Sequence, residues 1–255
     1  MENKQLVGEV FTTKSWGGLK IIAYNGNRKV RVKFLQTGYE VETSLRDIRK
    51  GCGRDRLLPS VYGVGVVGSE PIVDKDGKKL KEYELWCSMF LRVYGSKKLL
   101  ELPTYKDCSI SDNFKYFPYF KDWCNNQVGF NNKDQVGNIF HLDKDLLLKG
   151  NKLYSEDTCV FLPSKINTIL PKCDRSRGDY YIGVSLDKSN GLYAASVNLS
   201  GKQKRLGYFY TEIEAFLAYK QAKEDYIKTV AEEWKNKIDT RAYEALMNYQ
   251  VEITD

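Results

Sequence analysis

The stretch Tyr180–Ala231, YYIGVSLDKSNGLYAASVNLSGKQKRLGYFYTEIEAFLAYKQAKEDYIKTVA, carries the clearest fold signal of this chain. Thr211, with Glu214 three residues later, is a capping-box pattern, so a helix is expected to begin after Thr211. Before it, three short β-prone runs are separated by turn residues, a spacing that predicts an antiparallel sheet with two tight hairpins. The runs are Tyr180–Ser185, Leu192–Leu199 and Lys204–Phe209.

The expected helix covers one face of this sheet with a mostly apolar stripe at helical period. The other face stays open and, by the alternation of side chains along a strand, carries Ser185, Tyr193 or Ser196, and Arg205. The stripe consists of Ala215, Leu217, Ala218, Ala222 and Tyr226.

Motifs within this stretch resemble those of the ethylene-response-factor (APETALA-type) DNA-binding domain. The matching segments are Gly183-Val184, Tyr193-Ala194-Ala195, Leu206–Thr211, Glu214-Ala215 and Ala218-Tyr219. The resemblance covers roughly the last third of the chain and implies that the three-stranded sheet lies in the major groove of double-stranded DNA. It places these positions against the DNA: Ile182, Ser185, Asp187, Ser196, Asn198, Gln203, Arg205, Tyr208 and Tyr219.

The candidate nucleic-acid-binding residues lie on or beside this sheet. Arg175 and Arg177 precede it, either as contacts to backbone phosphates or as part of a solvated linker. Many family members have arginine or tryptophan at four positions where this chain does not, so few bidentate guanine readers remain; the four are Ile182, Ser185, Asn198 and Gln203. A module that binds another protein is the alternative. The full candidate set is Arg175, Arg177, Ser185, Lys188, Tyr193, Ser196, Asn198, Lys202, Lys204, Arg205 and Tyr208.

The charge of the chain is uneven. It has 255 residues and a formal net charge of +7. Residues 1–60 hold 12 basic and 6 acidic side chains, and residues 172–210 hold 7 basic and 3 acidic ones, whereas the helix that follows is acidic. A basic sheet backed by an acidic helix suits attraction to phosphate groups, although many proteins with such an excess have no nucleic-acid partner.

Residues 136–170 are expected to form a strand, a loop, a second strand and a short helix. The segments Ile139–Asp145, Lys149–Lys152, Thr158–Pro163 and Ser164–Asn167 resemble the HNH endonuclease element of phage-encoded proteins. In that element an Asp–His pair ends the first strand and an Asn lies in the helix. Phage proteins also join such elements to APETALA-type domains, which is the order found here.

This second resemblance implies phosphodiester hydrolysis assisted by Mg²⁺ or Mn²⁺. Asp143 and Asn167 fall on ligand positions, and Asp145 is a further ligand or only a loop residue. Lys144 occupies the place of the general-base histidine, and a lysine with an ordinary pKa is protonated at pH 7, so it cannot accept a proton unless burial lowers its pKa by about 3 units. His141, the only histidine, shares a strand face with Asp143 by alternation and is either a substitute catalytic base or a surface residue. Because losing the general base removes about 10²–10⁴-fold of the rate, a degenerate element is expected.

The remaining residues predict an α+β fold of three modules. In the first, Lys29–Phe34 alternates apolar side chains with three cations, which form a phosphate track or a solvated strand face. The glycine-rich segment Pro59–Gly68 is expected to be a linker or an extended packing segment.

Helices are expected at Glu82–Val93 and Ser111–Cys124, and Pro118 kinks the second helix or moves its start. The first module, residues 1–70, is expected to be basic and barrel-like. The second, residues 71–171, is expected to be helical with an HNH-like ββα region, and the third, residues 172–255, to be an APETALA-type domain.

Six scattered cysteines without a metal-ligand spacing argue against a zinc site. The chain shows no leader and no long apolar run, so it is expected to stay off membranes, in the cytoplasm of an infected bacterium if it is phage-encoded. The leading hypothesis is a phage-type DNA-binding protein with a degenerate HNH-like centre. One alternative is a phage factor that binds a host protein, for instance to inhibit an enzyme, and another is an active nicking or homing endonuclease.

Overall fold

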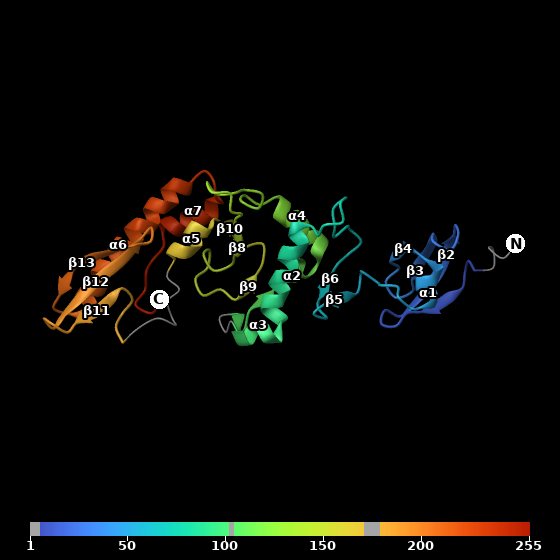
Figure 1. Ribbon diagram of the computed structural model, residues 1–255, viewed down its shortest axis with the longest axis horizontal. Helices are drawn as coiled ribbons and strands as arrows, with labels where there is room; N and C mark the ends of the chain where they lie inside the picture. Colours follow the sequence, from blue (N-terminus) through green and yellow to red (C-terminus); the bar gives the residue numbers. More distant parts are fainter. Residues whose placement is uncertain (1–5, 102–104, 171–178) are drawn as a thin grey trace. The chain divides into compact units, whose positions relative to one another are not determined.

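The computed structural model describes residues 6–101, 105–170 and 179–255 (Figure 1). The chain forms two compact units: unit 1 is Met1–Cys124 with Lys152–Ser155, and unit 2 is Asn125–Asn151 with Glu156–Asp255. The fold mixes helices and strands, which confirms the α+β class. The finer division into three modules stays a prediction. No helix within the described ranges is both long enough and apolar enough to cross a bilayer.

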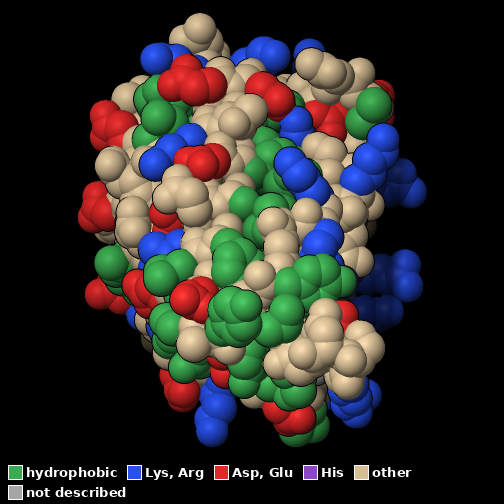
Figure 2. Space-filling view, turned by 90° about the vertical axis from the view of Figure 1, so that its left-hand side faces the viewer, with side chains coloured by type: hydrophobic (Ala, Val, Ile, Leu, Met, Phe, Trp, Pro, Cys, Tyr) green, Lys and Arg blue, Asp and Glu red, His purple; other side chains and the backbone are tan. Residues whose placement is uncertain are grey.

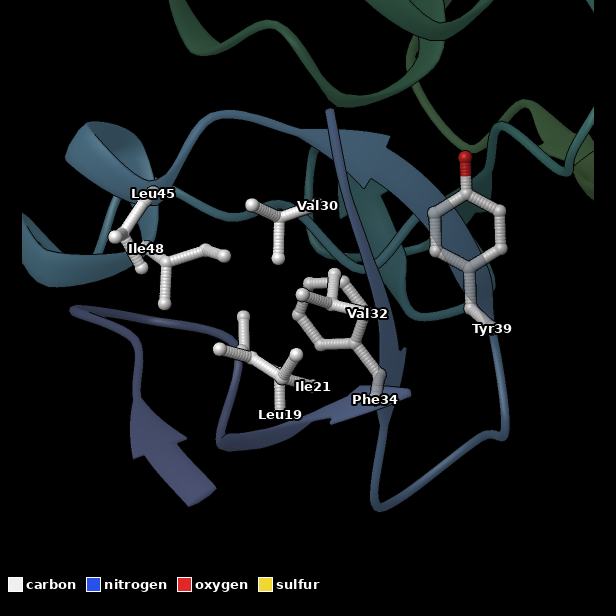
Figure 3. Close-up of a cluster of buried hydrophobic side chains, with 8 residues drawn as sticks. All are labelled: Leu19, Ile21, Val30, Val32, Phe34, Tyr39, Leu45 and Ile48. Atoms are coloured by element: carbon white, nitrogen blue, oxygen red, sulfur yellow. The ribbon is translucent and has the colours of Figure 1, made fainter. Parts of the chain in front are cut away.

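Unit 1 begins with a four-stranded antiparallel sheet in the order β1-β2-β3-β4. Val30, Val32 and Phe34 of β3 are fully buried while the residues between them are exposed, as the alternation predicted. Helix α1 closes the sheet, with Ser44 as its N-cap. Figure 3 shows its side chains Leu45 and Ile48 pointing toward those of β2 and β3. The elements are β1 (Val10–Thr12), β2 (Gly18–Tyr24), β3 (Val30–Phe34), β4 (Glu40–Thr43) and α1 (Leu45–Arg49).

The glycine-rich segment is not a linker but a packed hairpin of β5 (Pro59–Val61) and β6 (Gly65–Val66). A Cβ on Gly65 would lie 2.8 Å from the Trp86 ring and 2.9 Å from Phe90, so only glycine lets the strand lie this close to the aromatic side chains. The segment therefore belongs to the aromatic core of unit 1.

That core is built on α2 (Lys81–Tyr94), whose residues Trp86, Met89, Phe90 and Val93 are buried as expected. The predicted helix Ser111–Cys124 is broken: a 3₁₀ turn at Asn113–Lys115 precedes α4 (Phe117–Asn125). Pro118 lies in the first turn of α4, where its missing N–H costs nothing, so the proline moves the helix start. The other elements here are α3 (Ser96–Glu101), β7 (Ser109–Ile110) and β9 (Leu153–Tyr154), and β7 pairs with β9 in parallel.

Unit 2 contains the expected strand, loop, strand and helix. Strand β8 (His141–Asp143) pairs antiparallel with β10 (Val160–Leu162), and α5 (Ser164–Ile169) follows directly. In the register, Asp143 lies opposite Val160 and His141 lies opposite Leu162. The ββα arrangement of this segment was thus predictable from the sequence.

The C-terminal part of unit 2 is a three-stranded antiparallel sheet, β11-β12-β13, packed on α6. Thr211 caps α6, and both hydrogen bonds of the Thr211–Glu214 capping box are present. The register shifts between Ala195 and Ser196, because Leu206 of β13 is an extra residue in a bulge. The elements are β11 (Val184–Asp187), β12 (Leu192–Leu199), β13 (Lys202–Phe209), α6 (Glu212–Trp234) and α7 (Thr240–Met247).

The expected apolar stripe of α6 is correct only in part: Ala215 is buried and Ala222 packs against the core below the sheet, but Leu217 does not. Leu217 is 53% exposed, whereas Phe216 and Tyr219 are buried against the sheet. The helix is long enough to bury a second surface beyond the sheet, and the packing of α7 and the tail on it moves its apolar face.

Candidate nucleic-acid interface and nuclease-like element

The face of the C-terminal sheet that α6 does not cover carries a defined set of side chains. Residues that pair directly across antiparallel strands share a face. One row is Ser185, Ala194 and Tyr208, and the next is Ser196 and Arg205. The bulge at Leu206 brings Arg205 and Tyr208 to the same face although three positions separate them. We call these residues, with Asp187, Asn198 and Gln203, the open face.

Some predicted contacts lie elsewhere. Three of them project from the side of the sheet that α6 covers. Lys204 lies directly opposite the buried Val197, and Lys202 lies opposite Leu199. By alternation along β12, Tyr193 shares this side with Val197 and Leu199. Lys188 is exposed in the β11–β12 turn. Ile182 and Tyr219, which the family resemblance also placed against DNA, are buried in the core below the sheet.

Arg205 is oriented by its neighbours. Its guanidinium lies 5.3 Å from the centre of the Tyr208 ring, a distance suited to cation–π attraction. The pKa of the Asp187 carboxyl is lowered, chiefly by hydrogen bonds from Ser189 and further by the charge of Arg205. The carboxylate partly offsets the positive charge of Arg205, so the open face itself is not strongly basic.

Within the C-terminal sheet, the positive charge is concentrated along strand β13. Its residues 202–205 are all exposed, and three of the four are lysine or arginine. Just beyond the strand, apolar side chains are also exposed: Tyr210 is 85% exposed, Leu217 53% and Ile213 45%. Figure 2 shows hydrophobic side chains gathered among charged ones on the face seen from this end. A charged edge next to an apolar group offers contacts to phosphate and to a protein partner alike.

In the nuclease-like element, Asp143 is buried at 7% exposure. Its Oδ1 atom accepts hydrogen bonds from the backbone N–H groups of Asp145, at 2.9 Å, and Leu146, at 2.8 Å. Asp143 therefore shapes the turn after β8 with one carboxylate oxygen, and the other oxygen accepts no hydrogen bond from a described residue.

Lys144 is the unexpected part of this element, because it is only 5% exposed and its side chain turns into the loop. Its Nζ atom donates to the Asp145 carboxylate and, at 2.9 Å, to the carbonyl of Asn151. The Asn151 amide in turn donates to the Lys144 carbonyl at 2.8 Å. Asn151 was missed by the sequence analysis because nothing local marks a partner seven residues away. With its ammonium donating in this way, Lys144 is not placed to accept a proton.

The other proposed groups are less constrained. His141 is exposed, whereas Asp143 on the same short strand is buried. Asn167 Oδ1 is a buried side-chain acceptor, and within the described ranges it has no hydrogen-bond partner. Oδ2 of Asp143 and Oδ1 of Asn167 are hard oxygen donors of the kind that Mg²⁺ and Mn²⁺ prefer, so these two side chains match a divalent ion by chemical type. Asp145 instead pairs with Lys144. No cluster of three or more His, Cys, Asp or Glu side chains suited to a metal occurs in the described part.

The structural role of Asp143 and its predicted role as a metal ligand can be separated by mutation. Asp143→Asn keeps an acceptor oxygen for the two N–H groups but removes the negative charge, so the fold is expected to persist while Mn²⁺ affinity falls. Asp143→Ala removes both, and leaving the two N–H groups without an acceptor is expected to cost about 1–3 kcal/mol. Mn²⁺ titration calorimetry and urea denaturation measure the two effects. Equal Mn²⁺ affinity in the wild type and Asp143→Asn would exclude the carboxylate as a ligand.

Arg175 and Arg177 lie outside the described residues, so their part in the interface remains a prediction. The structure brings together Asp143, Lys144 and Asp145 at one strand end, and Ser185, Ser196, Arg205 and Tyr208 on one sheet face. Comparison of this chain with known protein families, with curated proteins and with solved structures gives no match in any of the three.

Proposed function

We propose that this protein binds double-stranded DNA through its C-terminal sheet, and that its ββα element is a degenerate, HNH-like centre with little or no hydrolytic activity. The observation that carries the first part is the exposed run 202–205 on β13, next to an open sheet face held rigid by α6. An uncovered antiparallel sheet can enter the major groove. Lys202 and Lys204 project from the other side of its edge strand and would contact phosphates beside the groove.

The side chains of the open face favour weak sequence discrimination. Arg205 is the one guanidinium among them and is the candidate for a bidentate contact to guanine. Ser185 and Ser196 are short and can bond several bases. Most of the affinity would then come from phosphates, and binding would decline steeply with salt.

The proposal of a degenerate centre rests on Lys144. Lys144 occupies the position of the general base, but its side-chain nitrogen donates hydrogen bonds to the Asp145 carboxylate and the Asn151 carbonyl. His141 is exposed and free to rotate toward solvent, and it is the remaining candidate to accept a proton. Asp143 and Asn167 would hold Mg²⁺ or Mn²⁺, which when bound polarises a phosphate oxygen. Retention of DNA without efficient cleavage is the expected outcome.

The test is a supercoiled-plasmid assay with and without Mg²⁺ or Mn²⁺, scored for both gel shift and nicking. We expect a shift that weakens as salt rises and little nicking with either ion. Rapid metal-dependent nicking that disappears in Asp143→Ala and in His141→Ala would instead establish an active nicking or homing endonuclease. Absence of any shift at low salt would refute DNA binding.

Replacing Arg205 by alanine is expected to weaken binding to duplex DNA by about 1–3 kcal/mol, because the variant loses a charge and a planar hydrogen-bonding group. The control is Arg205→Lys, which keeps the charge and loses the fork geometry and stacking. A phosphate contact predicts that lysine restores most of the affinity, whereas a base contact predicts that it does not. Fluorescence anisotropy with a labelled duplex measures both variants. Unchanged affinity in Arg205→Ala would favour a protein partner.

A second candidate function is supported by the exposed apolar group of Tyr210, Ile213 and Leu217. Ile213 and Leu217 lie one helical turn apart on α6, so their side chains form one surface. A host protein bound there would be held by apolar contacts, and its affinity would vary little with salt. That behaviour is opposite to the one expected for DNA, so a salt series distinguishes the two functions.

A further inference from the structure

The positive charge of the N-terminal module is not located where the strand pattern suggested. Of the three cations that alternate along residues 29–34, two form ion pairs with one shared carboxylate: Arg31 and Lys33 both pair with Glu40, at 3.3 Å and 3.6 Å. Arg31 also lies directly opposite Glu42 in the sheet. This strand face is a mixed-charge surface and is a poor track for phosphate.

A second group of cations lies around helix α1 and is not neutralised. All five members are exposed, and none of them forms an ion pair with any other residue that the structure describes. We call them the α1 basic cluster: Lys14, Arg46, Arg49, Lys50 and Arg54.

The fold brings these five residues together. Leu45 and Ile48 point into the core of the sheet, so the remaining positions of α1 face outward. Arg46 and Lys50 are separated by one helical turn and share that outer surface. The backbone N–H of Lys14 donates to the carbonyl of Gly51 at 3.1 Å, which places Lys14 beside the end of the helix. Arg54 comes three residues after Gly51 in the chain, and its side chain is exposed.

Few carboxylates oppose this cluster. Asp47 lies in the first turn of α1, where its carboxylate accepts a hydrogen bond from the hydroxyl of the N-cap residue Ser44 at 2.7 Å. Asp55 follows Arg54 but is 1% exposed, and it accepts from the Thr37 hydroxyl at 2.6 Å and from the Leu57 backbone. The Asp55 carboxylate therefore lies below the surface that carries the cations. Five exposed cations beside one half-buried carboxylate give a concentrated positive surface of the kind that attracts a polyanion.

We propose that the α1 basic cluster is a second nucleic-acid contact, which binds the phosphate backbone of duplex DNA without reading its sequence. The inference rests on the proposed DNA binding of the C-terminal sheet and adds a second site to it. The cluster contains cations and no exposed amide or aromatic side chain to recognise a base, which suits contact to phosphate alone. Two contacts on one chain raise the local concentration of each for the same DNA molecule.

The test compares two double variants of the full chain that lose the same net charge from the same module. Arg49→Gln/Lys50→Gln removes two members of the cluster, and Arg31→Gln/Lys33→Gln removes two cations already paired with Glu40. Binding to a labelled mixed-sequence duplex of about 30 bp is measured by anisotropy between about 50 and 200 mM salt, without divalent metal. We expect the cluster variant to bind roughly tenfold more weakly at low salt, with a log–log salt slope reduced by about two. The control variant should stay within about twofold of the wild type, because its cations are already compensated.

Each outcome bears on the proposal. Equal losses in the two double variants would overturn it, because net charge alone would then explain binding. Unchanged binding in both, with a wild type that binds the duplex, would also overturn it while leaving the C-terminal interface intact. A wild type that binds no duplex would refute the proposed function itself. A larger loss with an RNA duplex than with DNA of the same sequence would reassign the cluster to RNA.

Discussion

Replacing Trp86 by alanine is expected to destabilise unit 1 by about 3–5 kcal/mol, the usual cost of deleting a large buried aromatic side chain. The Trp86 ring is fully buried and lies 4.6 Å from Phe90 and 5.6 Å from Phe117, measured between ring centres. Its Nε1–H donates to the carbonyl of Phe114 at 2.7 Å. Alanine leaves both a cavity and a buried carbonyl without its donor, and the two costs add.

Hydrogen exchange of peptides from α2 and α4 measures this loss, with peptides from unit 2 as internal reference. Trp86→Phe keeps an aromatic ring in the core but removes the N–H donor and part of the indole volume, so it should cost less than Trp86→Ala. We expect it to cost about 1–3 kcal/mol. Trp16→Ala, a partly buried tryptophan of the same unit, should have a smaller effect on these peptides. Similar protection of α2 in Trp86→Ala and in the wild type would contradict the expected role of the indole.

The elements that sequence patterns predicted well are those whose signals are local. In β3 a strict alternation places Val30 and Val32 inside, because one face of the strand packs on the core and the other faces water. The start of α6 follows from Thr211 and Glu214, whose reciprocal hydrogen bonds involve only residues three positions apart. Such features depend on neighbours in the chain and need no knowledge of the tertiary structure.

The stripe on α6 was only partly correct because two different surfaces are buried along one helix. Phe216 and Tyr219 pack on the sheet, while farther along Ile227 and Trp234 are buried too. Glu224 is also buried, since it accepts from Lys220 at 2.6 Å and from the Val251 backbone at 2.8 Å. Because the side chain of Glu224 is charged, a search for apolar residues at helical spacing does not recognise that this position is buried. Such a search therefore misassigns part of the buried face of α6.

The nuclease-like element shows a similar limit. Its order of strand, strand and helix was predicted from short apolar runs and turn residues. The orientation of individual side chains was not: alternation gave His141 and Asp143 the same environment, whereas one is exposed and the other buried. Strand β8 has only three residues, and its last side chain turns to accept N–H groups of the following turn. At a strand end the hydrogen bonds of the loop, rather than the pleat, decide where a side chain points.

Replacing Gly183 by alanine is expected to destabilise the C-terminal sheet by about 2–5 kcal/mol. Gly183 has φ +76°, and a Cβ there would lie 2.1 Å from a Tyr219 ring atom. A side chain in this left-handed region costs about 1–2 kcal/mol, and forcing the Tyr219 ring aside in a packed core adds about 1–3 kcal/mol. The carbonyl of Gly183 also accepts from the Ser196 backbone N–H at 2.9 Å, so displacement here loosens β12 directly. Hydrogen exchange of peptides covering β12 measures the effect.

Gly191 provides a matched control because its φ of +71° is nearly the same and no atom lies within 4 Å of its Cβ position. Gly191→Ala should therefore cost only the backbone term of about 1–2 kcal/mol, and the difference between the two variants isolates the contact with Tyr219. If the sheet binds DNA as proposed, duplex affinity should fall in Gly183→Ala and change little in Gly191→Ala. Equal destabilisation by the two substitutions would mean that Tyr219 moves aside at no cost. Lost β12 protection with intact DNA affinity would mean that DNA is bound elsewhere on the chain.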